Sequence, residues 1–316
     1  MGFGDIAEKT RNPKESLVDE NKALILKSNK EKDTLEDNRT ILISGDNGTG
    51  KSTLALDLLC NDLKDDEMVI YISVDNSGKQ LILDFFDDLW YNDNIKHLDT
   101  YASKTVIKDG KPKEEIDEEG IMDNVIAQAT AIKELLEEGV NIKGVIIDGV
   151  SFLLEFAEAR MRLEKNLSPD QGVTMAAWKI RNKYFREFYL PYMNLPISVI
   201  FVSHADFIEK PTDDDLSNVK KKFIDLCSNR IETYNVIKDN VSDFHAIIKK
   251  DRTLPCNVNS DLIFLSVNIS KEMQEREEVF LEDLGEDRSE DISKMIFRKP
   301  LKKSKNPKSK KKSDSK

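Results

Sequence analysis

Cysteine and histidine are scarce in this chain. Its 316 residues include three cysteines, Cys60, Cys227 and Cys256, and none of them belongs to a C-x-x-C pair. This usage argues against a disulfide framework and against structural zinc, and it is typical of a reducing compartment. The three histidines lie far apart in the sequence, so we expect no histidine metal cluster.

Long hydrophobic runs are also missing. No apolar stretch approaches the roughly 18 residues that a membrane-spanning helix requires. The first five residues lack the basic and then apolar segments of a secretory signal. We therefore expect no membrane partner and a cytoplasmic location, which is the host cytoplasm if the chain is viral. The hydrophobic content of 39% is enough for one large domain, with or without appendages.

Acidic residues outnumber basic ones, but the charge is unevenly placed. The net charge is −11, whereas residues 298–316 alone carry +9, which leaves −20 for the rest of the chain. This Lys/Ser/Pro-rich tail cannot bury a core, so we expect it to be disordered and either to contact nucleic-acid phosphates or to add solubility. Residues 271–297 are acidic and predict a helical or linker segment, and residues 1–38 predict a charged leader.

The most informative stretch is a phosphate-binding loop pattern, G-x-x-x-x-G-K-[ST]. It is formed by Gly45, Asp46, Asn47, Gly48, Thr49, Gly50, Lys51 and Ser52. An apolar run precedes it and helix-forming residues, beginning with Thr53, follow it, which aims a helix N-terminus at a phosphate. We expect this loop and Thr53 to bind ATP, with Lys51 reaching the β- and γ-phosphates and Ser52 holding Mg²⁺.

A second nucleotide signature lies at residues 144–148. The run Gly-Val-Ile-Ile-Asp has the Walker B form, and Asp148 at its end is expected to hold Mg²⁺ directly or through water, opposite Ser52. Lys51 and Asp148 are 97 residues apart, with at least one strand–helix unit between them. An added strand between the loop strand and the Walker B strand is typical of RecA- and AAA-type ATPases. No N-K-x-D guanine signature is present, which favours ATP over GTP.

Hydrolysis also needs a group that orients the attacking water. Asp75 follows the apolar run 68–74, where RecA-like proteins often carry an acidic residue; the alternative is that Asp75 only caps a turn. Glu155 is a second candidate. His204 ends the apolar run 198–203, and we expect it either to sense the γ-phosphate or to be structural.

Alternating strands and helices predict an α/β fold with a mostly parallel sheet flanked by helices on both faces. The ATPase domain is expected to span residues 39–270. Beyond the runs named above, we predict helices at 80–91, 123–138 and 173–189, the last ended by Pro191, and strands at 100–107, 143–150, 244–249 and 262–267. The last two strands are expected to close the sheet as an antiparallel extension.

The phosphate loop, the run 145–148 and the run 199–204 (Val-Ile-Phe-Val-Ser-His) together resemble the RecA-like phage nucleotide-binding family, which includes the Sak-type single-strand annealing recombinases. The resemblance covers about residues 39–270. It implies a RecA-like P-loop NTPase that assembles into a homo-oligomeric ring or filament. It further implies action on DNA, single-stranded in the first instance, in recombination, annealing or replication of a phage.

The run 246–252, Ala-Ile-Ile-Lys-Lys-Asp-Arg, is similar to the end of the DnaB-like helicase core, where a K-x-R pair reaches the ATP of the next subunit. This likeness implies that Lys250 and Arg252 act in trans, so that hydrolysis depends on assembly. The glycine that usually follows the arginine is replaced by Thr253-Leu254-Pro255. The alternative is a solvated hairpin end.

The same resemblance places DNA-binding loops at residues 158–172 and 205–222. The helix predicted at 178–189 mixes aromatic and basic side chains, which suits either base stacking or packing on the sheet. Two further functions stay open. The chain is a helicase or DNA-packaging motor of the same fold, or it is an ATP-dependent regulatory or scaffold protein that moves no DNA.

Overall fold

The computed structural model of the chain describes residues 38–268, apart from residues 62, 75–77, 109, 169, 206–213, 239–240 and 253–257. Nearly all of the leader, the acidic segment, the basic tail and Asp75 therefore lie outside the described residues. Among the described helices, none is both long and apolar enough to cross a membrane.

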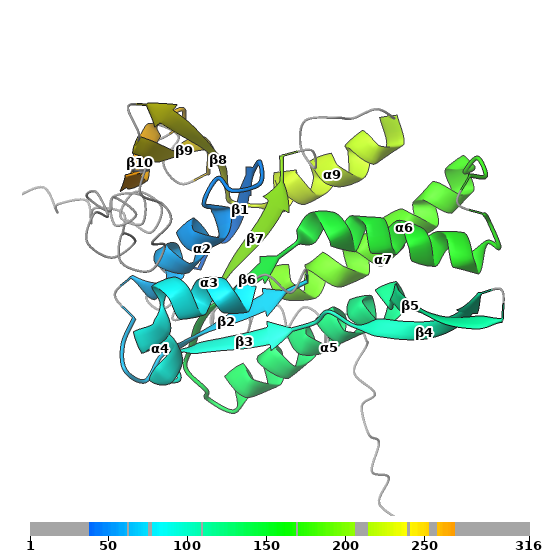
Figure 1. Cartoon of the computed structure of the whole chain (residues 1–316), viewed down its shortest axis with the longest axis horizontal. Coiled ribbons are helices and arrows are strands. Elements are labelled where there is room, and N and C mark those ends of the chain that lie inside the picture. The colour runs from blue at the N-terminus through cyan, green and yellow to red at the C-terminus, as the bar shows by residue number, and fades with distance from the viewer. Residues whose placement is uncertain are drawn as a thin grey trace, which may run out of the picture. The chain divides into compact units, whose positions relative to one another are not determined.

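An eight-stranded sheet forms the centre of the fold, in the order β10-β9-β8-β1-β7-β6-β2-β3 (Figure 1). The strands are β1 (Thr40–Gly45), β2 (Met68–Ser73), β3 (Ile95–Asp99), β6 (Ile142–Asp148), β7 (Ser198–His204), β8 (Asn229–Lys238), β9 (Val241–Asp251) and β10 (Asp261–Asn268). The strands from β8 to β3 pair in parallel, while β9 and β10 are antiparallel. The predicted mostly parallel sheet with antiparallel C-terminal strands is confirmed.

Helices cover both faces of this sheet. One face is covered by α2 (Lys51–Cys60), α3 (Gly78–Phe85) and α4 (Asp87–Tyr91), and the other by α5 (Glu118–Glu137), α6 (Val150–Glu164), α7 (Met175–Met193) and α9 (Asp214–Leu226). Successive side chains of a strand point to opposite faces. Accordingly Ile41 and Ile43 pack with the first group, and Leu42 packs with the second.

Several predicted boundaries were wrong. Helix α7 continues through Pro191 to Met193, where the buried Tyr192 donates a hydrogen bond to the carbonyl oxygen of Val125 at 2.6 Å. This tertiary contact outweighs the helix-breaking tendency of proline in the last turn. The helix predicted at 80–91 is divided at Phe86, whose φ of −137° is not helical.

Parts of the two predicted DNA-binding loops are helical. Residues 158–164 belong to α6, which covers the sheet with buried side chains, and residues 214–222 belong to α9. Strands β3 and β8 were not predicted. The strand expected at 100–107 is instead β4 (Ser103–Lys108), which pairs with β5 (Lys111–Ile116) in a separate antiparallel hairpin. Figure 1 shows this hairpin beyond the end of β3.

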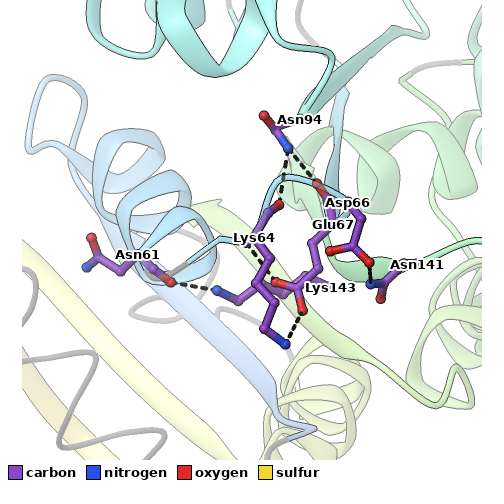
Figure 2. Close-up of polar contacts among 7 residues, drawn as sticks. All are labelled: Asn61, Lys64, Asp66, Glu67, Asn94, Asn141 and Lys143. Carbon is purple, nitrogen blue, oxygen red and sulfur yellow. Dashed lines mark hydrogen bonds and ion pairs between the residues drawn. The ribbon is translucent and has the colours of Figure 1, made fainter.

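A polar network holds the loop between α2 and β2 at the amino ends of the parallel strands (Figure 2). Asn94, which is 8% exposed, donates from Nδ2 to three carbonyl oxygens of this loop, those of Lys64, Asp65 and Glu67. Lys143 donates from Nζ to the carbonyl oxygen of Asn61 at 2.5 Å. These contacts fix the edge of the sheet that lies opposite the strand carboxyl ends.

Candidate functional site

The strand register brings three predicted site segments to one edge of the sheet. Gly45 at the end of β1 pairs with His204 at the end of β7. Asp148 at the end of β6 pairs with Val202 on one side and with Ser73 on the other. Strand β7 therefore lies between the loop strand and the Walker B strand, as expected for a RecA-like arrangement.

The phosphate loop is held in shape by its own polar groups. Lys51 opens α2 and is 9% exposed, and its Nζ donates to the carbonyl oxygen of Asp46 at 2.5 Å. The hydroxyl of Thr49 donates to the same carbonyl oxygen at 2.8 Å. Gly50 has a φ of +74°, and a Cβ at this position would lie 2.9 Å from Cζ of Phe264. A side chain at position 50 is therefore disfavoured by backbone conformation and by space.

Ser52 and Asp148 meet although they are distant in the sequence. Ser52 donates from Oγ to Oδ2 of Asp148 at 2.5 Å. The carboxylate is 7% exposed, and the buried Tyr71 hydroxyl donates to the same Oδ2 atom. The Asp148 carboxylate therefore accepts from two hydroxyl groups, that of Ser52 on the phosphate loop and that of Tyr71 in the core.

This donor set fits Mg²⁺. Hydroxyl and carboxylate oxygens are hard ligands, and Mg²⁺ usually takes one or two protein groups and completes its shell with water and phosphate oxygens. Across the described ranges, no group of three or more His, Cys, Asp or Glu side chains could hold a metal alone. Ser52 and Asp148 are thus a partial set of the kind that Mg²⁺–nucleotide sites use.

A cavity of about 270 Å³ joins the predicted groups. Its walls include Asn47, Lys51, Ser52, Asp148 and His204. Phe152 of α6 meets the His204 ring edge-on, with ring centroids 5.7 Å apart. His204 ends β7 beside the Walker B strand and lines the same cavity as the loop lysine.

A second cavity, of about 480 Å³, lies on the other side of the phosphate loop. Residues 48–53 form one wall, and side chains from α3, β8, β9 and β10 form the others, namely Leu81, Phe85, Asn235, Ile237, Ser242, Phe244 and Leu265. The sequence did not reveal the part of this lining that β8 contributes, Asn235 and Ile237, because β8 was not predicted. The sequence feature that could have indicated this strand is the apolar pair Val236–Ile237. In the structure this pair lies at the exposed end of β8, where Ile237 is 65% exposed.

A protein-family model matches the part of the chain that contains the phosphate loop and the Walker B strand. Residues 26–167, which contain the phosphate loop and Asp148, match the family model described as "ATPase: KaiC". The fold is that of a RecA-like ATPase of the KaiC type.

Solved structures with a similar fold include two archaeal proteins. A KaiC-like protein from Pyrococcus horikoshii OT3 is 13% identical with a TM-score of 0.43, and covers 74% of this chain and 87% of its own. The flagellar accessory protein FlaH from Methanocaldococcus jannaschii is 14% identical with a TM-score of 0.41, and the corresponding coverages are 74% and 87%. A comparison with curated proteins gave no match. The family model supports the RecA-like ATPase fold, and the more specific resemblance to phage annealing recombinases stays a prediction.

Two further candidates, Asp75 and Glu155, were expected to orient the attacking water. Asp75 is outside the described residues. Glu155 lies on the solvent side of α6 with its carboxyl partly covered, and this partial burial raises its pKa above the usual 4.5, while the charge of His204 partly offsets the rise. Glu155 lines the groove between α6 and the β4–β5 hairpin, so it is a neighbour of His204 rather than part of the phosphate cavity.

The structure does not bring Lys250 and Arg252 to this chain's own phosphate loop. They lie at the end of β9, where Arg252 donates from its backbone N–H to the carbonyl oxygen of Ser228, just before β8. Lys250 donates from Nζ to the carbonyl oxygens of Ile224 and Asp225 at 2.9 and 3.0 Å, and Arg252 also donates to that of Asp225. Within the chain, both cations therefore hold the C-terminal end of α9.

The aromatic residues of α7 mostly pack inward. Phe185 and Phe188 are both 0% exposed and belong to the core against the sheet, so they offer no surface for base stacking. Among the basic residues of the first predicted DNA loop, Arg160 pairs with Asp123 at 2.8 Å and Arg162 with Glu158 at 2.9 Å. These cations are engaged within the chain.

Proposed function

We propose that this chain binds ATP with Mg²⁺ at the carboxyl edge of its parallel sheet and hydrolyses it. The observation that carries the proposal is the 2.5 Å contact between Ser52 Oγ and Asp148 Oδ2. It joins the phosphate loop to the Walker B strand inside a cavity that Lys51 and His204 also face. A buried serine–carboxylate contact beside a loop lysine is the arrangement that a magnesium–nucleotide site requires.

Each group has a distinct task in this proposal. Backbone N–H groups of residues 45–53 surround the phosphates, and Lys51 exchanges the Asp46 carbonyl oxygen for phosphate oxygens. Ser52 and Asp148 would hold the Mg²⁺ ion, which when bound neutralises charge on the β- and γ-phosphates. His204 donates to or senses the terminal phosphate from the far wall, and Asp75 orients the attacking water.

In this proposal the nucleoside of ATP binds in the second cavity. It adjoins residues 48–53, and its walls combine Phe85, Phe244 and Leu265 with the polar side chains of Asn235 and Ser242. Apolar walls with a few polar groups suit a planar base and its sugar. In this proposal β8, β9 and β10 supply the wall of the nucleoside site beside the phosphate loop.

The DNA-directed role rests on the sequence resemblance alone. In this version a homo-oligomer acts on single-stranded DNA in recombination, annealing or replication, with Arg252 reaching the neighbouring site; a helicase or packaging motor is a variant of it. The second candidate is an ATP-dependent regulatory or scaffold protein. Phe185 and Phe188 are buried, so packing on the sheet, rather than base stacking, is the role of these two aromatics, and the loss of this stacking surface favours the second candidate.

The test is ATP turnover, measured with and without single- and double-stranded DNA at low salt, together with the oligomer mass. Lys51→Ala is expected to abolish turnover, whereas Lys133→Ala, at an exposed ion pair of α5, is the matched control and should leave it unchanged. Turnover that survives Lys51→Ala contradicts the assigned site. Stimulation by single-stranded DNA supports the DNA-directed version, and an equal rate with every DNA supports the regulatory one.

A further inference from the structure

Tyr71 is a polar side chain in the middle of the apolar core beneath α2. It lies on β2, is 0% exposed, and packs among the side chains that α2 and α3 cover. Burying a phenol hydroxyl is costly unless it has a hydrogen-bond partner. Here the partner is Oδ2 of Asp148, the carboxylate at the end of the Walker B strand.

The same carboxylate oxygen accepts from two elements at once. Ser52 donates from the first turn of α2, and Tyr71 donates from the adjacent strand β2. Two donors from different directions fix the rotation of a carboxyl group more tightly than one donor does. The Asp148 side chain is thereby oriented toward Ser52.

The ring of Tyr71 is itself held in place. His97 of β3 stacks on it with ring centroids 5.9 Å apart and planes inclined by 29°. On another side lies Gly78, where a Cβ would come within 2.1 Å of the tyrosine ring. The first turn of α3 therefore passes directly over the ring, and this close approach requires glycine.

We propose that Tyr71 is the positioning residue for Asp148 and so sets how strongly Mg²⁺ and nucleotide binding are coupled. The inference rests on the proposed ATP site. Tyr71 does not touch the nucleotide; it holds the carboxylate in the orientation that the ion requires. Groups that orient a metal ligand in this way typically change metal affinity by about 10- to 100-fold when they are removed.

The experiment compares ADP affinity in MgCl₂ and in EDTA by isothermal titration calorimetry. In the wild-type chain, Mg²⁺ should tighten ADP binding. Tyr71→Phe keeps the ring and removes the hydroxyl. The Mg²⁺ concentration that gives half of the tightening of ADP binding should therefore rise about 10-fold, while ADP affinity in EDTA stays the same. Added to Asp148→Asn, the tyrosine substitution should cause no further loss, because the two groups act through one contact.

Tyr192→Phe is the matched control. Tyr192 is also 0% exposed, and its hydroxyl donates to the Val125 carbonyl oxygen on the opposite face of the sheet. Both variants should lose thermal stability, which melting without ligand measures, but Tyr192→Phe should keep the full Mg²⁺ effect. An unchanged Mg²⁺ effect in Tyr71→Phe overturns the inference alone. Absence of ADP binding in the wild-type chain overturns the proposed function and this inference together.

Discussion

Thr49 of the phosphate loop and Thr233 of β8 share a hydrogen bond between their hydroxyl groups, with the two Oγ1 atoms 2.8 Å apart. Both side chains are buried, at 3% and 2% exposed. The Thr49 hydroxyl also contacts the Asp46 carbonyl oxygen at 2.8 Å, and the Thr233 hydroxyl contacts that of Ser44 at 3.5 Å. The conformation of the phosphate loop is therefore supported by a strand that follows it by more than 180 residues.

Thr233→Val tests this support. Valine keeps the shape and removes the hydroxyl, which leaves the buried Thr49 hydroxyl with one hydrogen-bond partner fewer. We expect the free energy of unfolding to fall by about 1–2 kcal/mol in urea titrations, and ADP affinity to fall as the loop loosens. Thr105→Val is the control, since the Thr105 hydroxyl contacts Glu114 on the exposed hairpin. Equal effects of the two substitutions would contradict the proposed support.

Two glycines with nearly the same φ allow the cost of backbone strain to be measured apart from the cost of a steric clash. Gly50 and Gly110 have φ values of +74° and +72°, but a Cβ on Gly110 would meet nothing within 4 Å. Gly110→Ala should therefore cost about 1 kcal/mol in unfolding free energy, the penalty for positive φ alone. Gly50→Ala should cost more, because the methyl group presses on Phe264, and it should abolish ADP binding. If the two variants lose similar unfolding free energy and Gly50→Ala still binds ADP, the steric clash with Phe264 is contradicted.

The elements that the sequence revealed share one physical property. Strands β1, β6 and β7 are buried on both faces, so they are nearly continuous apolar runs. Strand β1 ends at Gly45 of the phosphate loop, and β6 and β7 end in Asp148 and His204. Strand β8 alternates buried and half-buried residues as far as Tyr234 and is exposed beyond it. Because it also carries Arg230, Glu232 and Lys238, it lacks the apolar run by which the other strands were predicted. The Thr49–Thr233 and Tyr71–Asp148 contacts depend on strand order and register. Such contacts cannot be inferred from local patterns.

The carboxyl of Glu155 should make stability depend on pH. Burial raises the pKa of Glu155, Glu158 adds to the rise, and His204 and Lys220 from β7 and α9 oppose it. A folded-state pKa above the unfolded value means that the protonated group favours folding, and that this advantage is lost as pH rises through the folded pKa. Glu155→Gln should therefore stabilise the chain relative to wild type more at neutral pH than at acidic pH. Urea unfolding at both pH values measures this, with Glu134→Gln on the exposed side of α5 as the control.

Arg252 has one observed role within the chain and one proposed role between chains. Its contact with the Asp225 carbonyl oxygen places a cation at the C-terminus of α9, where the helix dipole favours positive charge. Arg252→Ala should lower the free energy of unfolding by about 1 kcal/mol on this account. Lys249→Ala is the control, because Lys249 lies near the end of β9 and pairs with Glu232 of β8 at 3.2 Å. A stability change no larger than that of the control would contradict the capping role.

The proposed trans role has a separate test, which mixes two inactive chains. Lys51→Ala disables a chain's own loop, and Arg252→Ala would disable only the site of its neighbour. In a random equal mixture, about a quarter of the interfaces would pair an intact loop with an intact arginine, so ATP turnover should reappear. The reappearing turnover should increase with time allowed for subunit exchange, because active interfaces form only in mixed assemblies. If Arg252 acts only by holding α9 in its own chain, the mixture stays no more active than its two components.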